Sequence, residues 1–431
     1  MKQRLMGVCI ACLAIAPAAA LAAAAVEYTG RPPGVEAQQS KNSQGFPNPQ
    51  LIEGKPLETR PGEKANGYPT FPQQTRAPYK QSAPFKTTTL TTALKQPWAL
   101  QFLSNGRMLV TEKPGTMRIV AADGSLSDAI KGLPAVNFGG QVGLLDVALD
   151  KNYAKNKRIF FSYSELVGTD ESNIVLASAN LDEAGLALGN VKVLFRVTPV
   201  LPKALVANEG GRIAIDPKDG SVFMICGDRS RSPPWMMAQK LDNTLGKMIH
   251  LTAEGKPHPS NPYLRTKGAL PEIWSIGHRS EEGAAFDPAG RLWETEHGAR
   301  GGDELNLVKR GANYGWPVVS HGIDYPGFPL GDGSVSKPGM EEPRYYWDPV
   351  IGPSGLAFYK GNLFPAWKGS VFVGGLRGTQ LSRLKLVNDK VVEEEPLLYD
   401  MKLRIRDVRV GPDGAVYVLA DTGQLLKLTP N

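Results

Sequence analysis

The chain places its densest group of chemically capable side chains in residues 277–317, which read GHRSEEGAAFDPAGRLWETEHGARGGDELNLVKRGANYGWP. His297, Arg300, Asp303 and Glu304 stand among glycines too closely spaced for an ordinary core. Main-chain carbonyls in such a segment are free to coordinate a cation, and carboxylate oxygens suit the same task. We interpret the segment as the wall of a site. A solvated glycine-rich loop is the alternative.

Turn chemistry places this charged segment at the end of a strand. Asp287-Pro-Ala-Gly290 separates the apolar residues ending at Phe286 from Leu292-Trp293, which is typical of a hairpin. The charged residues after Trp293 are therefore expected where a strand leaves its sheet. Tyr314 and Trp316, close by in the sequence, favour a site wall over a solvated loop.

A hairpin pattern recurs along the chain: an apolar alternating run, a tight polar turn with glycine, and a second apolar run. Four clear copies turn at glycines 106, 220, 290 and 414, over residues 98–110, 213–225, 285–293 and 408–419. Two weaker copies cover residues 144–163 and 356–373. The sequence thus contains six similar units.

The spacing of these units indicates the fold class. The four glycines are 114, 70 and 124 residues apart, so the long gaps each hold one more unit and the period is about 60 to 70 residues. We expect an all-β chain whose residues 85–431 form a six-bladed β-propeller of four-stranded antiparallel blades. A β-sandwich would not explain six such units, and a propeller gathers its loops at the mouth of a central channel.

The N-terminus has the order of a secretory signal. Lys2 and Arg4 precede an apolar run over residues 5–16 and small residues over 18–25. We predict a signal peptide over residues 1–25 and a periplasmic or secreted protein with no membrane span in the mature chain. A retained N-terminal anchor is the alternative.

Residues 26–84 form a segment of different composition. Proline, glutamine, serine, lysine and glycine dominate it, and it lacks a periodic apolar pattern. We expect an extended, proline-rich arm that wraps or tethers the propeller.

Charge and cysteine content limit the class of function. The formal charge of +7 falls to +5 once Lys2 and Arg4 leave with the signal, which fits an anionic small ligand or an acidic envelope surface. The basic residues lack the aromatic interleaving of a nucleic-acid binder. Cys226, the one cysteine after the signal, lies in an apolar run that predicts a buried strand and a packed thiol.

Ten short motifs follow one another between Gln96 and Pro430: Gly140-Gln-Val-Gly-Leu-Leu-Asp146, Gly210-Gly-Arg212, Cys226-Gly-Asp-Arg229, Leu245-Gly-Lys247, Gly277-His-Arg279, Glu296-His-Gly298, Gly302-Asp-Glu-Leu-Asn306, Asn313-Tyr-Gly-Trp-Pro317, Pro353-Ser-Gly-Leu-Ala-Phe358 and Arg404-Ile-Arg-Asp-Val408. In these motifs the chain resembles the soluble, PQQ-dependent sugar dehydrogenases of the glucose/sorbosone dehydrogenase type. The resemblance implies oxidation of an aldose to its lactone, with hydride transfer to the quinone cofactor PQQ and electron transfer from PQQ to an external acceptor.

The cofactor that the resemblance implies carries three carboxylates, which arginine's planar fork suits better than lysine. Arg404 and Arg406 are two apart on an expected strand, so both could face the channel. An exposed basic stripe is the alternative.

The resemblance adds four further cofactor contacts. Gln141 and Arg279 match residues that contact the quinone. Ser280 stands where the family has asparagine, which indicates an altered pocket, and Arg377 stands where the family usually has lysine. The second replacement keeps the charge but changes its reach and hydrogen-bond geometry.

Calcium is the metal that the resemblance implies, as a Lewis acid beside the quinone. It places two main-chain ligands at Gly298 and Ala299, although the family has proline at the second position. A second, structural calcium would use the Glu304 side chain and the Tyr314 carbonyl. Salt bridges from Asp303 and Glu304 to Arg300 or Lys309, without metal, are the alternative.

The general base is where the chain departs from the family. The family uses the histidine of an H-x-G-G-R motif, but this chain reads Asn208-Glu-Gly-Gly-Arg212, and asparagine accepts no proton at neutral pH. Glu209 could replace it if its carboxylate turned inward, although its place in the motif favours an outward side chain. Alternatively the protein oxidises slowly, or it is a noncatalytic propeller that binds sugar, quinone or protein. A lactonase propeller fits these motifs less well, and the sequence leaves the oligomeric state open.

Overall fold

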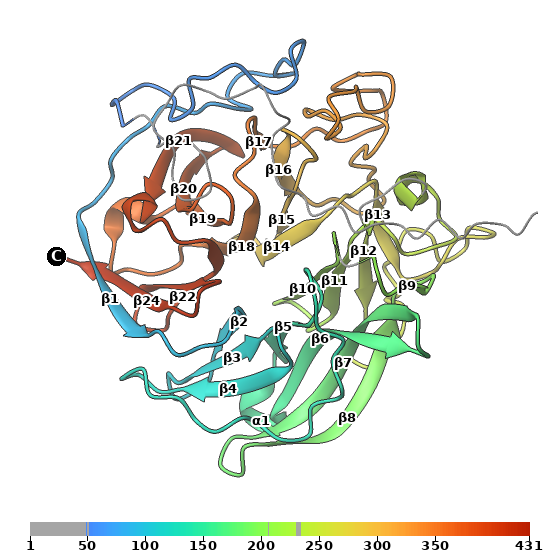
Figure 1. Cartoon of the computed structure of the whole chain (residues 1–431), viewed down its shortest axis with the longest axis vertical. Helices are drawn as coiled ribbons and strands as arrows, with labels where there is room; N and C mark the ends of the chain where they lie inside the picture. The colour runs from blue at the N-terminus through green and yellow to red at the C-terminus, as the bar shows by residue number, and fades with distance from the viewer. Residues whose placement is uncertain (1–48, 50, 206, 230–233) are drawn as a thin grey trace, which may run out of the picture.

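Six small antiparallel sheets surround a central channel in the computed structural model, which describes residues 49, 51–205, 207–229 and 234–431 (Figure 1). The prediction of an all-β, six-bladed propeller is confirmed. Four blades have four strands each, one has three and one has five. The predicted signal peptide (1–25) and the first part of the arm lie outside the described residues.

The blades follow one another along the chain, and we number them from the first complete one. Blade 1 holds β2 (Pro97–Phe102), β3 (Met108–Glu112) and β4 (Thr116–Val120). Blade 2 holds β5 (Leu144–Leu149), β6 (Arg158–Val167), β7 (Glu171–Asp182), β8 (Ala187–Arg196) and β9 (Leu201–Pro202). Blade 3 holds β10 (Gly210–Ile215), β11 (Val222–Cys226), β12 (Lys247–Leu251) and β13 (Ile273–Ile276).

The remaining three blades complete the ring. Blade 4 holds β14 (Glu281–Phe286), β15 (Leu292–Glu296), β16 (Asp303–Leu307) and β17 (Tyr345–Trp347). Blade 5 holds β18 (Pro353–Phe358), β19 (Ser370–Gly375), β20 (Gln380–Val387) and β21 (Lys390–Leu397). Blade 6 holds β22 (Ile405–Val410), β23 (Val416–Ala420), β24 (Leu425–Pro430) and β1 (Phe85–Thr91). The described helices are short: α1 (Tyr153–Asn156) and the 3-10 turns η1 (Pro234–Gln239), η2 (Pro365–Trp367) and η3 (Tyr399–Met401).

The six repeating hairpins of the sequence are the first two strands of the six blades. Gly106 and Gly290, in two of the tight turns, have φ of 80° and 78°, a conformation that L side chains rarely adopt. The first strands of neighbouring blades pack on one another around the channel. Side chains on the sheet faces fill the space between blades, and Cys226 lies buried among them as predicted.

Each first strand carries a β-bulge near its start. The register shifts occur at 97/99, 144/147, 210/213, 281/283, 353/356 and 405/407. A bulge bends the strand and re-aims the extra residue, and bulges are over-represented next to active sites. Six bulges at the same end of six first strands therefore shape one mouth of the channel.

The ring closes between the two ends of the propeller. β1 pairs with β24 along its whole length, from Phe85 opposite Pro430 to Thr91 opposite Leu425. An N-terminal strand thus completes the C-terminal blade, and the edge of β24 is not left unpaired.

The arm lies outside this ring, along the outermost strands of blades 4 and 5 (Figure 1). Gln74 accepts a backbone hydrogen bond from Tyr346 at 2.8 Å, and Tyr79 forms a parallel bridge with Glu394. Ser82 donates to the carboxylate of Glu395 from both its backbone and its hydroxyl. The described arm therefore covers two exposed sheet edges.

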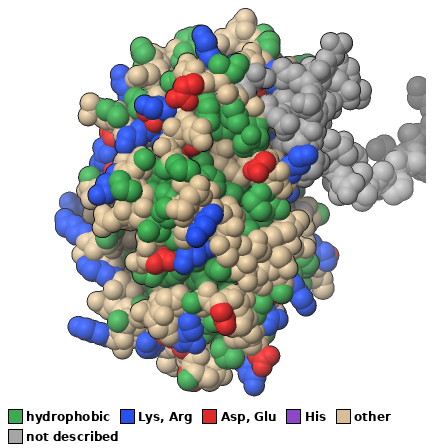
Figure 2. Space-filling model, turned by 90° about the vertical axis from the view of Figure 1, so that its left-hand side faces the viewer, with side chains coloured by type: hydrophobic (Ala, Val, Ile, Leu, Met, Phe, Trp, Pro, Cys, Tyr) green, Lys and Arg blue, Asp and Glu red, His purple; other side chains and the backbone are tan. Residues whose placement is uncertain are grey.

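The outer surface carries a mixture of side chains. On the side shown in Figure 2, lysine and arginine side chains lie scattered among acidic, polar and apolar ones. None of the helices in the described parts of the chain has the length and apolar character that a membrane crossing requires.

Candidate functional site

A cavity of about 270 Å³ opens at the bulged mouth of the channel. Its volume lies close to the lower end of small-molecule pockets, roughly 300–1,000 Å³. Nine of the residues predicted to bind cofactor or metal or to act as base line it: Gln141, Asn208, Glu209, Arg279, Gly298, Ala299, Arg377, Arg404 and Arg406. His297 and Asp303 of the charged segment line it as well. Residues from all six blades or their connecting loops thus meet in one place.

Arg404 and Arg406 both line the cavity, but not through simple strand alternation. β22 begins at Ile405, and the bulge between residues 405 and 407 turns Arg406 inward. Both guanidinium groups bond Asp421, at 3.0 Å from Arg404 Nε and 2.7 Å from Arg406 Nε. Arg406 also donates to Glu282 at 3.2 Å. Arg404 keeps 36% of its side chain exposed, so it can turn toward an anion.

Arg279 forms a fixed cationic wall. Its guanidinium lies 5.2 Å from the ring centre of Trp316 and donates to Tyr325 Oη at 2.9 Å and to the His297 carbonyl at 3.1 Å. The residue is 2% exposed. Packing and hydrogen bonds thus hold a planar donor group in place, which suits a carboxylate ligand.

The structure adds lining residues that the sequence did not single out as ligands. Lys113 lines the cavity, donates to the Gly140 carbonyl at 2.7 Å and has its pKa lowered by burial and by Arg406. Glu282 and Asp421 line it as counter-charges to the arginines. Bulges and loop contacts bring these three residues inward. The hydrophobic periodicity of the sequence predicts neither the bulges nor the loop contacts.

Asn208, the residue that the sequence resemblance matches to the family's histidine, is held by two side chains. Its backbone N–H donates to Gln141 Oε1 at 2.7 Å, and its Nδ2 donates to Asp228 Oδ1 at 2.8 Å. Asp228 also accepts from Trp316 Nε1 at 2.7 Å. The φ of Asn208 is 52°, a left-handed conformation that asparagine tolerates better than most residues.

Glu209 is buried, contrary to the outward orientation that its place in the motif favours. It lines the cavity and is 2% exposed, with Oε2 at 2.7 Å from Arg229 Nη1. Burial raises the pKa of Glu209 to about 8; Arg229 opposes this rise, and the charges of Glu282 and Asp228 add to it. A carboxyl group in such a state can exchange a proton near neutral pH.

Gly298 and Ala299 lie beside these groups. Both residues line the cavity, and neither carbonyl accepts a hydrogen bond from a described residue. Asp303 braces the segment by accepting from Gly298 N at 2.8 Å and from the Ile351 and Gly352 amides at 2.7 Å. Two adjacent carbonyl oxygens without protein partners fit the oxygen-ligand chemistry of calcium.

Glu304 and Tyr314 lie apart from this cavity, in a second acidic region behind it. Asn306 Nδ2 donates hydrogen bonds to Glu304 Oε2 at 3.0 Å and to Glu296 Oε1 at 3.2 Å. Burial, Glu296 and other carboxylates raise the pKa of Glu304 well above its usual value. The ring of Tyr314 stacks on His278 at 4.6 Å.

The structure brings additional potential ligands to this acidic region. His278, Glu294 and Glu296 place one ligand atom each within 4.8 Å of the others. They come from the turn after β13 and from β15, so their meeting depends on sheet register.

Two alternatives from the sequence are wrong in detail. Arg300 forms an ion pair with Glu63 of the arm and Lys309 forms one with Glu341, and neither pairs with Asp303 or Glu304. The exposed basic stripe is excluded as well, because Arg406 is 9% exposed and lines the cavity with Arg404. Ser280 is fully buried and is not among the residues that line the cavity.

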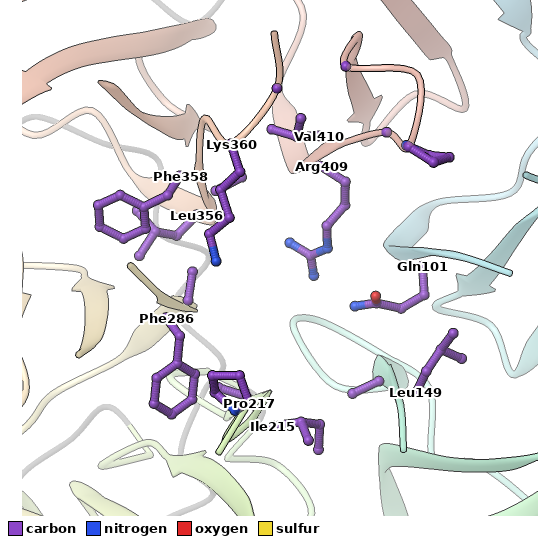
Figure 3. A pocket seen from close by; sticks show the side chains of 18 of the residues that line it. Gln101, Leu149, Ile215, Pro217, Phe286, Leu356, Phe358, Lys360, Arg409 and Val410 are labelled. Atoms are coloured by element: carbon purple, nitrogen blue, oxygen red, sulfur yellow. The ribbon is translucent and has the colours of Figure 1, made fainter. Parts of the chain in front are cut away.

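A second, larger cavity of about 840 Å³ opens at the opposite end of the channel, where the first strands end (Figure 3). Gln101, Lys360 and Arg409 point into it from blades 1, 5 and 6. Arg409 bonds Asp407 at 2.8 Å and the Leu100 carbonyl at 3.0 Å. Apolar side chains such as Phe286 make up much of its wall.

Comparison with known proteins agrees with this geometry. The glucose/sorbosone dehydrogenase family model matches residues 94–427. The chain belongs to this family. It is 40% identical over 344 residues to the aldose sugar dehydrogenase of Escherichia coli (strain K12), which covers 78% of this chain and 91% of that protein.

Solved structures of the family share the fold. A crystal structure of a glucose dehydrogenase superposes with a TM-score of 0.76 at 41% identity, covering 80% of this chain and 99% of that one. The PQQ-bound form of an aldose sugar dehydrogenase from Streptomyces coelicolor gives 0.65 at 28% identity, covering 81% and 99%. The family model begins at residue 94, so the arm lies outside the part that defines the glucose/sorbosone dehydrogenase family.

Proposed function

We propose that the protein oxidises an aldose sugar at its anomeric carbon to the lactone, with PQQ as hydride acceptor and an external acceptor for the electrons. The observation that carries this proposal is the convergence of Arg279, Arg377, Arg404 and Arg406 on one cavity. Membership of the glucose/sorbosone dehydrogenase family supports it. The secretory order of residues 1–25 supports a periplasmic site of action.

The residues present fit the proposed cofactor and metal. The arginines and Gln141 would hold the quinone's carboxylates and ring, and the Gly298 and Ala299 carbonyls would ligate Ca²⁺. When bound, the quinone accepts hydride while calcium polarises it as a Lewis acid. Glu304 and Tyr314 would hold a second, structural Ca²⁺, which supports the fold and not the reaction.

We assign the general base to Glu209. Proton removal from the anomeric hydroxyl needs an acceptor with a pKa near the operating pH. Burial lowers the pKa of His297 to about 3, and its Nε2 is engaged with the Pro353 carbonyl at 2.6 Å. Asp303 already accepts three backbone hydrogen bonds, and Asp421 is paired with two arginines. Burial also raises the pKa of Asp303, to about 7, and that of Glu282, but both oxygens of Asp303 are occupied by backbone donors and Glu282 accepts from Arg406. Glu209, with a pKa of about 8, is therefore the cavity carboxylate that we choose as the base.

A noncatalytic binding propeller is the second candidate function. Asn208 favours it, because the amide at the histidine position donates to Asp228 and offers no basic nitrogen. In that case the cavity would bind sugar or quinone without turnover.

Reconstitution of the purified protein with PQQ and Ca²⁺ tests both candidates. We expect dye reduction with glucose as probe, and a loss of about a hundred- to ten-thousandfold in Glu209→Gln. Glu165→Gln, which changes an exposed ion pair on β6, is the matched control and should keep activity.

Two outcomes would contradict the proposal. Activity that appears only in Asn208→His would favour the binding propeller. Absence of activity in both proteins, together with no change in the quinone absorption spectrum on mixing, would exclude the dehydrogenase.

A further inference from the structure

The arm touches the cavity wall through a buried carboxylate. Asp348, after β17, accepts from the backbone N–H of Glu63 at 2.8 Å and of Lys64 at 3.3 Å. A Cβ atom on Gly62 of the arm or on Gly301 of the cavity loop would overlap the Asp348 carboxylate. Asp348 is therefore wedged between the arm and the loop that contains Gly298 and Ala299.

A second contact joins the arm to the same loop directly. Glu63 Oε2 accepts from Arg300 Nε at 2.8 Å and lies 2.7 Å from Arg300 Nη2. Both side chains are 15% exposed, so water screens this pair less than a surface pair. Arg300 directly follows Ala299, one of the two residues whose carbonyls accept no hydrogen bond from the described part of the chain.

A third contact reaches the segment that supplies Tyr325 to the cavity. Lys64 Nζ donates to the Ser320 carbonyl at 2.6 Å. The segment that follows pairs back to the loop, with Arg300 and Ile323 exchanging backbone hydrogen bonds at 3.0 and 2.9 Å. It then supplies Tyr325, whose hydroxyl accepts from Arg279.

The loop needs such support because its own sequence does not define its shape. Gly301 and Gly302 have φ of 80° and 75°, and glycine in the unfolded or loosened chain samples many other conformations. A ligand that must order its own loop binds more weakly than one that meets a preorganised loop.

We propose that the arm is a built-in clamp: Glu63, Gly62 and Lys64 hold residues 298–302 in the conformation that presents the Gly298 and Ala299 carbonyls to a cation. Glu63 is thus a positioning residue that acts through Arg300. The identity of the cation rests on the proposed function, but the clamping of the loop does not. The arm lies outside residues 94–427, the part of the chain that the family model matches.

Amide hydrogen exchange and calcium titration of the full-length protein test the clamp. In Glu63→Gln without cofactor, we expect residues 298–302 to exchange roughly three- to tenfold faster, because the ion pair with Arg300 is lost. Calorimetric titration with Ca²⁺ alone should show affinity reduced by a similar factor. Lys80→Gln, which removes an exposed arm contact to Glu393, is the matched control and should change neither quantity.

A double-mutant cycle separates clamping from a general loss of stability. Glu63→Gln/Arg300→Gln should bind Ca²⁺ no more weakly than Arg300→Gln alone, because the two side chains act as one pair. Gly62→Ala, which pushes on Asp348, should also speed exchange of residues 298–302.

Unchanged exchange in both folded variants, Glu63→Gln and Gly62→Ala, would overturn the clamp. So would strictly additive effects in the cycle. If the wild type binds no Ca²⁺ but the exchange of residues 298–302 still depends on Glu63, the clamp stands and the proposed metal site fails.

Discussion

Glu209 owes its chemical character to burial. The carboxyl is 2% exposed and has neighbouring acids in Glu282 and Asp228, so its single partner Arg229 does not offset the loss of water. The pKa of Glu209, about 8, therefore lies close to neutral pH. The same group links activity and stability to pH.

The rate of sugar oxidation should follow the ionisation of Glu209. We expect kcat/KM to rise about tenfold per pH unit and to level off above about pH 8, because only the ionised carboxylate accepts a proton. A pH profile of the reconstituted enzyme measures this. Glu209→Gln should show low activity that does not rise with pH in this range. The same rise of kcat/KM in the variant would mean that another group is the base.

The free energy of unfolding should respond to the same group. The pKa of Glu209 is about 8 in the folded protein and near 4.5 in the unfolded chain. Between these values the folded state holds more protons, so the contribution of Glu209 to stability is full below pH 4.5 and is lost as pH rises through 8. Thermal unfolding at pH 5 and pH 9 should thus show wild type losing stability relative to Glu209→Gln. A constant difference between the two proteins would contradict the raised pKa.

At the scale of the elements, the bulges at the starts of the first strands decide which side chains enter the channel. The bulge in β10 directs Arg212 across the axis, where it is fully buried. Its Nη1 lies 3.1 Å from Asp146 Oδ1 and its Nε donates to the Glu282 carbonyl at 2.8 Å. The guanidinium also stacks over Trp98 at 4.1 Å. Arg212 of blade 3 thus joins its own blade to blades 1, 2 and 4.

Removing Arg212 should destabilise the propeller strongly. In Arg212→Ala, the buried Asp146 loses its closer cation and keeps Arg409 at 3.9 Å, and removal of one partner of a buried ion pair typically costs about 3–5 kcal/mol. Denaturant unfolding measures this loss. Arg196→Ala, which breaks the exposed pair with Glu165, is the control and should cost about 1 kcal/mol or less. Equal losses in the two variants would mean that the channel network contributes no more than a surface pair.

At the scale of the whole molecule, the ring depends on a strand from the other end of the chain. β1 supplies the fourth strand of blade 6 and covers the edge of β24. Without it, a row of backbone groups on β24 would be left unpaired and open to association.

Shortening the chain tests this closure. We expect a chain that starts at residue 92 to unfold about 5 °C or more below one that starts at residue 85, and to associate, because only the chain that starts at residue 85 retains β1. Differential scanning calorimetry and light scattering measure the two effects. Equal melting temperatures would show that β24 needs no partner strand.

The sequence by itself determined the number of blades and the chemistry of their mouth. Alternating apolar runs and glycine turns are local properties, so they located all six inner hairpins correctly. The residue types in the ordered motifs identified the cations Arg279, Arg404 and Arg406, which do meet in one cavity. Local signals were sufficient because each blade repeats one short unit.

Tertiary structure alone decided how these groups are oriented and braced. Arg404 and Arg406 meet through a bulge, Glu209 turns inward, and Lys113 and Asp421 join them. The partner of Arg300 lies 237 residues away in the arm. Such contacts depend on register shifts and on burial by distant segments. No pattern along the chain encodes these contacts, because the register shifts and the burial arise only when the blades pack together.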